Sequence, residues 1–305
     1  MKRILSFVLS AVLMAGVFTG CSGDSGPEIV LYDGINSEMQ LIHKMVEILV
    51  EDKTDVEVTI KDQMSGVNMF RELTREDPSC DIMNSYDGTV LTTFLKQDPS
   101  DVPEGQTLYD YAKAQVKEQY GVDMLGQLGI NNTYCIAVPQ SVAEQYGLET
   151  ISDLAPAASE LRFGAEHEFF TEEGTMKYTP FTQFYGLNFK EKIPVDINLK
   201  YAAVENGNFD VTVVYTTDGL NRKANLKVLE DDRSFFPEYN GALLVREGLF
   251  EEMADMAPNL QEVLESLTGT LTNEKMTDLT YAVDVEGRTV EEVAREFLTE
   301  SGLIG

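Results

Sequence analysis

Two spacings of apolar residues, one typical of strands and one typical of helices, alternate along this chain. Runs in which apolar and polar residues alternate one by one are typical of strands, and they recur at 27–34, 54–62, 80–89, 131–139, 161–166, 205–218, 226–232 and 240–247. Stretches with apolar residues three and four apart are typical of helices, and they lie at 37–50, 65–76, 141–155, 178–187, 257–269, 273–283 and 289–302. Ser37 is expected to cap the first of these helices, and Gly302 to end the last.

Strands that alternate with helices predict an α/β fold with parallel sheets and helical covers. In such folds ligands bind beyond the carboxyl ends of the strands. Tyr86 and Tyr215 each stand at the end of a predicted strand, in "NSYDGT" and "TVVYTTDG". Both are therefore candidates for the floor of a binding site, although a tyrosine at a strand end can also be ordinary packing.

The first residues have the order of a bacterial lipoprotein signal. Lys2 and Arg3 precede an apolar run at 4–18 that is short for a membrane span, and small residues lead into Cys21. We expect a signal peptide over residues 1–21, diacylation of Cys21 and a tether over 22–28, which would anchor an extracytoplasmic protein to the outer face of the cell membrane. A cleaved signal, or an uncleaved helix with an incidental cysteine, is the alternative.

The chain is strongly acidic, with 52 aspartates and glutamates and a formal net charge of −29. Such a charge repels nucleic acid and attracts cationic ligands, although solubility on a bacterial surface explains it equally well. Cys80 and Cys135 have no metal-type spacing, so we expect buried free thiols, with a disulfide as the alternative.

The motifs of common catalysts are absent from the sequence. It has no Walker A motif, no H-E-x-x-H, no C-x-x-C and no G-x-S-x-G. Of its two histidines, His43 is expected to have a surface or boundary role, and His167 stands after a strand without a catalytic partner. We therefore expect no enzyme, no metal and no organic cofactor, but a receptor.

Several longer segments resemble the substrate-binding proteins of osmoprotectant-uptake ABC transporters, the glycine betaine/carnitine/choline-binding family. They include "INNTYCIAVP", "FGAEHEFF", "FDVTVVYTTDG" and "LKVLEDDRSFFPEYNGALLVRE", in order along nearly the whole chain. The resemblance implies a two-lobed type II periplasmic-binding fold with the ligand cleft between the lobes. It also implies lobes at 29–131 plus 236–305 and at 132–235, and ABC permease and ATPase subunits as partners.

Family members hold a quaternary ammonium group among tyrosines, and the matching motifs place such tyrosines at Tyr86, Tyr134, Tyr215 and Tyr239. A trimethylammonium group donates no ordinary hydrogen bond, so a protein recognises it by the faces of aromatic rings, at about 0.5–2 kcal/mol per contact. The resemblance thus implies a tyrosine cage for a small quaternary ammonium ligand.

The departures from the family concern the ligand's carboxylate. Betaine-binding members hold it with a lysine, where this chain has Gly34 after Asp33, and with an arginine, where it has Glu172 or Glu173. Thr89, which contacts the carboxylate in the family, is retained, and Asp87 stands beside Tyr86 where threonine is more usual.

A pocket with two cations fewer and added carboxylates disfavours a zwitterion. The sequence therefore predicts a ligand with net positive charge, choline first and a related amine with a second hydrogen-bond donor as the other candidate. Asp87, Thr89 and Glu172 are expected among its contacts. If Glu172 points into solvent, glycine betaine or carnitine becomes the ligand. A surface sensor or scavenger uncoupled from transport remains open, as does an unusual enzyme on the same fold.

Overall fold

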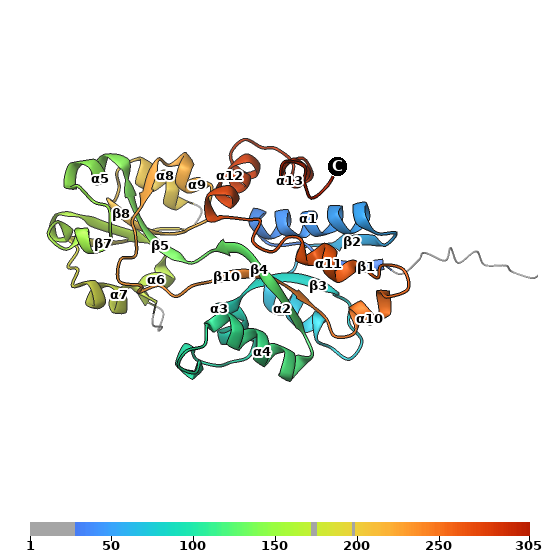
Figure 1. Cartoon of the computed structure of the whole chain (residues 1–305). Coiled ribbons are helices and arrows are strands. Elements are labelled where there is room, and N and C mark those ends of the chain that lie inside the picture. The colour runs from blue at the N-terminus through green and yellow to red at the C-terminus, as the bar shows by residue number, and fades with distance from the viewer. Residues whose placement is uncertain (1–27, 172–175, 197–198) are drawn as a thin grey trace, which may run out of the picture.

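The computed structural model describes residues 28–171, 176–196 and 199–305. The predicted signal peptide with Cys21, the tether up to residue 27 and Glu172 lie outside the described residues. The described chain forms two α/β lobes side by side, one around β1–β4 and β10 and the other around β5–β9 (Figure 1). We call them lobe 1 and lobe 2.

Lobe 1 contains two small sheets. The first pairs two parallel strands, β1 (Glu28–Tyr32) and β2 (Glu57–Lys61). The second has β10 (Asn240–Val245) between β3 (Ile82–Tyr86) and β4 (Asp123–Asn131), antiparallel to both. The two sheets are joined at Asp81, whose backbone N–H donates to the Val30 carbonyl and whose carboxylate accepts from the Val30 N–H.

Helices bury these sheets from two sides. One core contains apolar side chains of α1 (Ser37–Lys53), α10 (Leu249–Met253), α11 (Leu260–Glu265), α12 (Asn273–Asp284) and α13 (Val290–Glu300). The other contains those of α2 (Gly66–Leu73), α4 (Leu108–Tyr120) and the π-helical turn Val90–Phe94 that follows α3 (Asp87–Thr89). Alternate residues of β10 serve the two cores: Leu243 joins the first, Leu244 the second.

Lobe 2 is built on a five-stranded sheet in the order β7 (Glu191–Pro194), β6 (Arg162–Ala165), β8 (Val211–Tyr215), β5 (Tyr134–Pro139) and β9 (Leu226–Val228). Ile136 and Val138 face a large aromatic core, whereas Cys135 and Ala137 face the opposite side. Its helices are α5 (Gln140–Tyr146), α6 (His167–Thr171), α7 (Tyr178–Tyr185), α8 (Lys200–Glu205) and α9 (Leu220–Lys223).

The pattern of strands was predicted better than their directions. β1 with β2, and β6 with β7 and β8, are parallel as expected, but β10 and β5 are antiparallel to their neighbours. Both are joined to the segments on which the chain passes from one lobe to the other. A strand that follows such a segment enters its sheet from the end opposite to that of its neighbours. The alternation of apolar and polar residues does not reveal this direction. The sequence also did not predict α4 and β4, which cover most of 108–131.

Local details also differ from expectation. The N-cap of α1 is Asn36, whose side chain accepts from the Met39 N–H, so Ser37 is the first helical residue. His43 is completely buried rather than at the surface, and its Nε2 accepts from the Asn84 N–H. Burial lowers the pKa of His43 to about 4. In the described chain, Cys80 and Cys135 are buried free thiols, as predicted.

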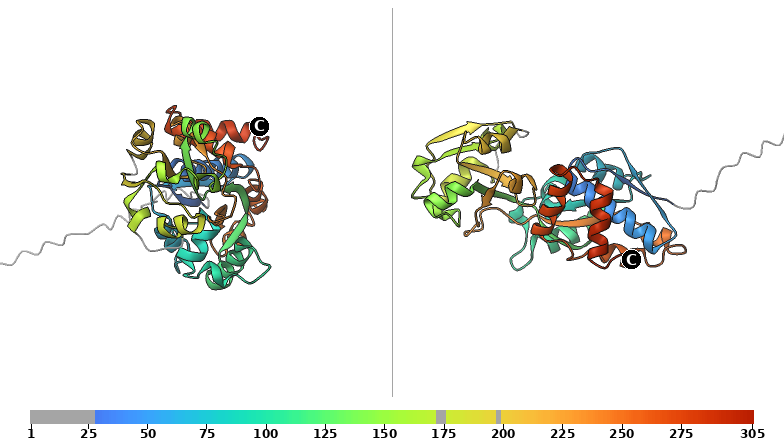
Figure 2. Two further views of the ribbon diagram at one scale, coloured as in Figure 1. Left: turned by 90° about the vertical axis from the view of Figure 1, so that its left-hand side faces the viewer. Right: turned by 90° about the horizontal axis from the view of Figure 1, so that it is seen from above.

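Two crossings join the lobes, and hydrogen bonds tie them to each other. The Asn132 N–H donates to the Tyr239 carbonyl (2.9 Å), and the Thr133 hydroxyl donates to the Pro237 carbonyl (2.8 Å). Seen from above, narrow segments run between the lobes (Figure 2). The pair of crossings therefore helps to fix the geometry of whatever lies between the lobes.

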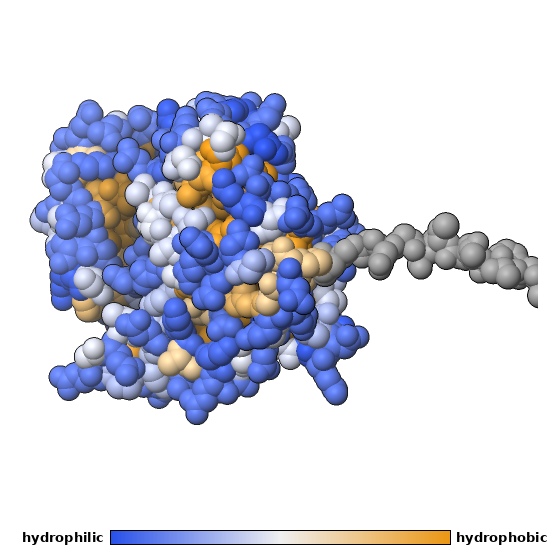
Figure 3. Space-filling view, turned by 45° about the vertical axis from the view of Figure 1, so that its right-hand side comes forward, coloured by the Kyte–Doolittle hydropathy of each residue, from blue (hydrophilic) through white to orange (hydrophobic). Residues whose placement is uncertain are grey.

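The face shown in Figure 3 is mostly hydrophilic, as the acidic composition requires, and its hydrophobic residues gather largely in recessed areas. Among residues 28–171, 176–196 and 199–305, no helix combines the length and the apolar character that a membrane crossing needs.

Candidate ligand-binding site

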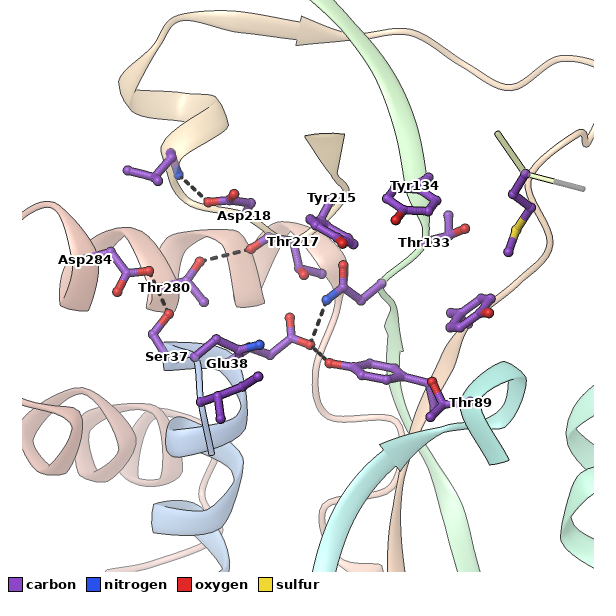
Figure 4. A pocket seen from close by; sticks show the side chains of 17 residues that line it. Ser37, Glu38, Thr89, Thr133, Tyr134, Tyr215, Thr217, Asp218, Thr280 and Asp284 are labelled. Atoms are coloured by element: carbon purple, nitrogen blue, oxygen red, sulfur yellow. Dashed lines mark hydrogen bonds between the residues drawn. The ribbon is translucent and has the colours of Figure 1, made fainter. Parts of the chain in front are cut away.

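A cavity of about 670 Å³ opens where the lobes meet. Its size lies within the range of small-molecule sites. Residues of both lobes and of the crossings line it (Figure 4): Ile35, Asn36, Ser37, Glu38, Tyr86, Thr89, Asn132, Thr133, Tyr134, Met176, Tyr215, Thr217, Asp218, Leu220, Tyr239, Thr280 and Asp284. All four predicted tyrosines and Thr89 are among them.

Tyr86 and Tyr239 form the pair on the side of lobe 1. Tyr86 ends β3, Tyr239 precedes β10, and their ring centroids are 6.5 Å apart with planes inclined by 46°. The Tyr86 hydroxyl donates to Oε1 of Glu38 in α1, which fixes that ring. Gly88 makes room for the other ring, because a Cβ at this position would lie 2.6 Å from Cζ of Tyr239.

Tyr134 and Tyr215 form the pair on the side of lobe 2. They stand directly opposite each other where β5 begins and β8 ends, with ring centroids 5.1 Å apart and planes inclined by 28°. Phe169 and Phe236 support Tyr134 with edge-on contacts at 6.0 and 6.3 Å. Tyr215 remains 38% exposed. Two strands and two crossings thus bring four rings to one cavity, where they can surround an alkylated ammonium group.

Asp87 lies beside this cavity but is not among its lining residues. Its side chain is completely buried, and its carboxylate accepts from the Gly88 N–H and from the backbone and side chain of Asn240 at 2.7–2.9 Å. Burial is the main cause that raises the pKa of Asp87 to about 6. Since Asp87 and Asn240 are the neighbours of Tyr86 and Tyr239 in sequence, this contact holds the first tyrosine pair together. The contacts described give Asp87 a positioning role, and its predicted contact with the ligand stays a prediction.

Glu38 stands at the centre of the lining, although the sequence did not single it out as a ligand contact. It is only 4% exposed, and its Oε1 accepts from Tyr86 and from the Asn132 side chain (3.1 Å). Its Oε2 is buried without a hydrogen-bond partner in the described chain. Burial raises the pKa of Glu38, the Asp218 charge adds to the rise, and the side chains of Thr217, Tyr86 and Asn132 oppose it.

Two further carboxylates line the cavity. Asp218 follows β8, and it accepts from the Tyr201 hydroxyl and from the Leu220 N–H (2.9 Å). Asp284, the last residue of α12, accepts from the Ser37 hydroxyl at 2.6 Å. Burial raises the pKa of Asp284, and the charge of Asp218 adds to the rise. Three acidic side chains therefore share one cavity.

No lysine, arginine or histidine is among the lining residues of the described chain. At Gly34, where the resemblance implies the family's lysine, this backbone leaves no room for a side chain, because a Cβ would lie 2.1 Å from Cβ of Met39. Lys200, which is 2% exposed, is used in an ion pair with Glu166 (2.6 Å). Glu172 lies outside the described residues, so its predicted place at the ligand stays a prediction.

Sequence reasoning therefore missed most of the polar lining. Asn132 and Asp218 belong to the segments "NNTY" and "YTTD", so their motifs could have identified them. Asp284 lies in the segment "LTYAVDVEGRTVEEVAREFL", which also resembles the family, but only the packing of α12 brings it to the cavity.

A cavity between two lobes, with aromatic walls and a few polar groups, is typical of a receptor for a small ligand. The chain belongs to the family of substrate-binding domains of ABC-type glycine betaine transport systems, which matches residues 28–300. Its fold is of the type II periplasmic-binding kind, and the family is not one of enzymes.

Three similar proteins illustrate the family. The ergothioneine transport permease/ergothioneine binding protein EgtU of Helicobacter pylori (strain G27) is 31% identical over 270 residues, 88% of this chain, and this chain spans only 46% of that protein. The carnitine transport binding protein OpuCC of Listeria monocytogenes (serotype 1/2a, strain 10403S) is 29% identical over 98% of this chain and 94% of its own. A solved glycine betaine/carnitine/choline ABC transporter structure superposes with a TM-score of 0.80 at 29% identity, covering 90% of this chain and 99% of the other.

Proposed function

We propose that this protein is the extracytoplasmic, lipid-anchored receptor of an ABC importer for quaternary ammonium compounds, with a choline-like cation preferred over betaines. Tyr86, Tyr134, Tyr215 and Tyr239 surround the ammonium group in this proposal. Cys21 carries the lipid, and an ABC permease and its ATPase receive the ligand. A signal of the lipoprotein type in the sequence and the family's role in ABC transport support these assignments.

The preference for a cation rests on the charges of the lining. Glu38, Asp218 and Asp284 line the cavity, and no basic side chain of the described chain does. A ligand carboxylate placed there would lose its water and meet three like charges without a basic side chain of the described lining to offset them, which costs several kcal/mol. A ligand with a net positive charge relieves the same repulsion.

Betaine-type ligands are the second candidate, because the relatives are named for carnitine and ergothioneine. For this chain to bind such a zwitterion, its carboxylate would need neutral donors. Thr89, Thr133 and Asn132 are the candidates in the lining. A betaine would thus be held by the neutral donors of the lining, whereas a cation such as choline would be favoured by its carboxylates.

Isothermal titration of the chain from residue 27 onward with choline and with glycine betaine tests the proposal. We expect choline to bind at micromolar concentration or tighter, and betaine at least about a hundredfold more weakly, the equivalent of about 3 kcal/mol. Tyr215→Leu should weaken choline binding about tenfold, because one ring face is lost. Tyr120→Leu is the matched control, since Tyr120 is also 38% exposed but does not line the cavity.

Equal binding of betaine would leave the receptor and overturn the charge preference. If neither ligand binds, the choline assignment fails. Whether the protein serves a permease or acts as a separate surface sensor is decided by choline uptake in cells that lack the gene, because a sensor leaves uptake unchanged.

A further inference from the structure

We propose that the cavity has a second cation subsite, formed by Glu38 and Asp284, and that the preferred ligand is a diamine. One nitrogen of this ligand is the quaternary ammonium held by the tyrosines, and the other is a protonated amine at the carboxylates. The inference rests on the proposed function, since it assumes the tyrosine cage.

The buried oxygen of Glu38 is the first observation. Oε1 already has two donors, the Tyr86 hydroxyl and the Asn132 side chain. Oε2 has no partner at hydrogen-bond geometry in the described chain, although the Thr217 side chain interacts with this carboxylate and lowers its pKa, and Glu38 lines the cavity. A buried carboxylate oxygen without a donor is costly, and native proteins seldom leave one in that state. When the Glu38 side chain turns Oε2 toward the cavity, a ligand N–H would supply the missing donor, and a trimethylammonium group has no N–H.

The position of the carboxylates is the second observation. In Figure 4 Asp284 and Ser37 lie on one side of the cavity, Glu38 lies near its centre, and Tyr134 with Tyr215 lies beyond it. Ser37 links Glu38 and Asp284, because it precedes Glu38 in the sequence and its hydroxyl donates to Asp284. Glu38 and Asp284 therefore lie to one side of Tyr134 and Tyr215, as a ligand with a cationic group at each end would require.

The balance of charge is the third observation. A monocation in the tyrosine cage leaves up to two of the three lining carboxylates uncompensated, whereas a dication offsets one more. A bound metal ion is a poorer alternative, because no three carboxyl, imidazole or thiol groups in the described chain converge as a metal site requires. An organic ammonium group, unlike a metal ion, can pair with carboxylates that do not converge on one point.

Two ligands of equal size separate this subsite from the cage. Aminopropyl-trimethylammonium and butyl-trimethylammonium have the same number of heavy atoms and the same cationic head, but only the first ends in a protonated amine. We expect the amine to bind at least about tenfold more tightly to the wild-type protein, since a hydrogen bond between charged groups typically gives tenfold or more. Isothermal titration at neutral pH measures both affinities.

Asp284→Asn tests the residue without removing the acceptor for Ser37. It should weaken binding of the amine about tenfold and leave binding of the butyl compound within about twofold. Glu274→Gln is the matched control, because Glu274 is in the same helix, is exposed and does not line the cavity. That variant should change neither affinity.

The outcomes are distinguishable. If the two compounds bind the wild-type protein equally, or if Asp284→Asn weakens both alike, the second subsite is wrong and the tyrosine cage stands. If neither compound binds while the protein is folded by circular dichroism, the proposed function itself fails.

Discussion

At the scale of single residues, Asp87 illustrates a carboxylate that serves the site without touching the cavity. It joins the ends of β3 and β10 through Asn240 and is completely buried. Burial raises the pKa of Asp87 from 3.8 to about 6, so the folded state binds its proton more tightly than the unfolded state does. This contribution to stability is fully present below pH 3.8 and is lost as the pH rises through about 6.

Asp87→Asn should remove this pH dependence. The free energy of unfolding of the wild-type protein, minus that of the variant, should increase by about 2.4 kcal/mol as the pH falls from 7 to 4, because one pKa unit corresponds to about 1.4 kcal/mol. Urea titrations at a series of pH values measure the difference.

Asp110→Asn, on the surface of α4, provides the baseline. A difference between wild type and Asp87→Asn that does not depend on pH would show that the pKa of Asp87 is near its ordinary value.

At the scale of elements, the contact of α12 with the turn after β8 connects the lobes. The Gly219 N–H donates to the Thr280 hydroxyl (3.1 Å), and Arg222 pairs with Asp278 (2.8 Å). Gly219 touches the helix backbone so closely that a Cβ there would lie 2.4 Å from the Tyr281 nitrogen. This approach sets where Tyr215 and Asp218 lie relative to lobe 1.

Gly219→Ala should therefore separate α12 from this turn. We expect choline binding to weaken at least about tenfold and the melting temperature to fall by about 2–4 °C or more, because a backbone clash cannot be relieved by rotation of a side chain. Calorimetry measures both effects.

Gly66→Ala is the control, since a Cβ there meets nothing within 4 Å and α2 gains a better helix former. Unchanged binding in Gly219→Ala would mean that this contact does not set the shape of the cavity.

At the scale of the whole molecule, the net charge of −29 acts on every approaching ligand. A field of this sign raises the local concentration of cations and speeds their association, and salt screens it beyond about 8–10 Å at physiological strength. The same field opposes anions.

Association of choline should therefore slow as salt is added, by about threefold to tenfold between low and physiological ionic strength, whereas dissociation should change much less. Stopped-flow tyrosine fluorescence can follow it, because the chain has 13 tyrosines and no tryptophan. An association rate that does not respond to salt would show that the charge serves solubility alone.

The sequence by itself determined the local elements and the aromatic part of the site. Period-2 runs gave the positions of β3 and β8, and their last residues, Tyr86 and Tyr215, do line the cavity. Such patterns are visible because a strand or helix shows its buried face within a few residues. The four tyrosines could also be identified from short motifs, since each motif keeps a ring at a strand end or crossing.

Only the tertiary structure decided which distant groups share the cavity. Tyr86 and Glu38 are 48 residues apart, and Ser37 and Asp284 are 247 apart, yet each pair forms a hydrogen bond. The antiparallel direction of β5 and β10 follows likewise from the crossings between lobes. Contacts of this kind depend on how helices and sheets pack across the whole chain, and no local period of the sequence records that packing. The tyrosines and Asp218 could therefore be identified from motifs of the sequence, whereas the place of Glu38 and Asp284 beside them depended on the tertiary structure.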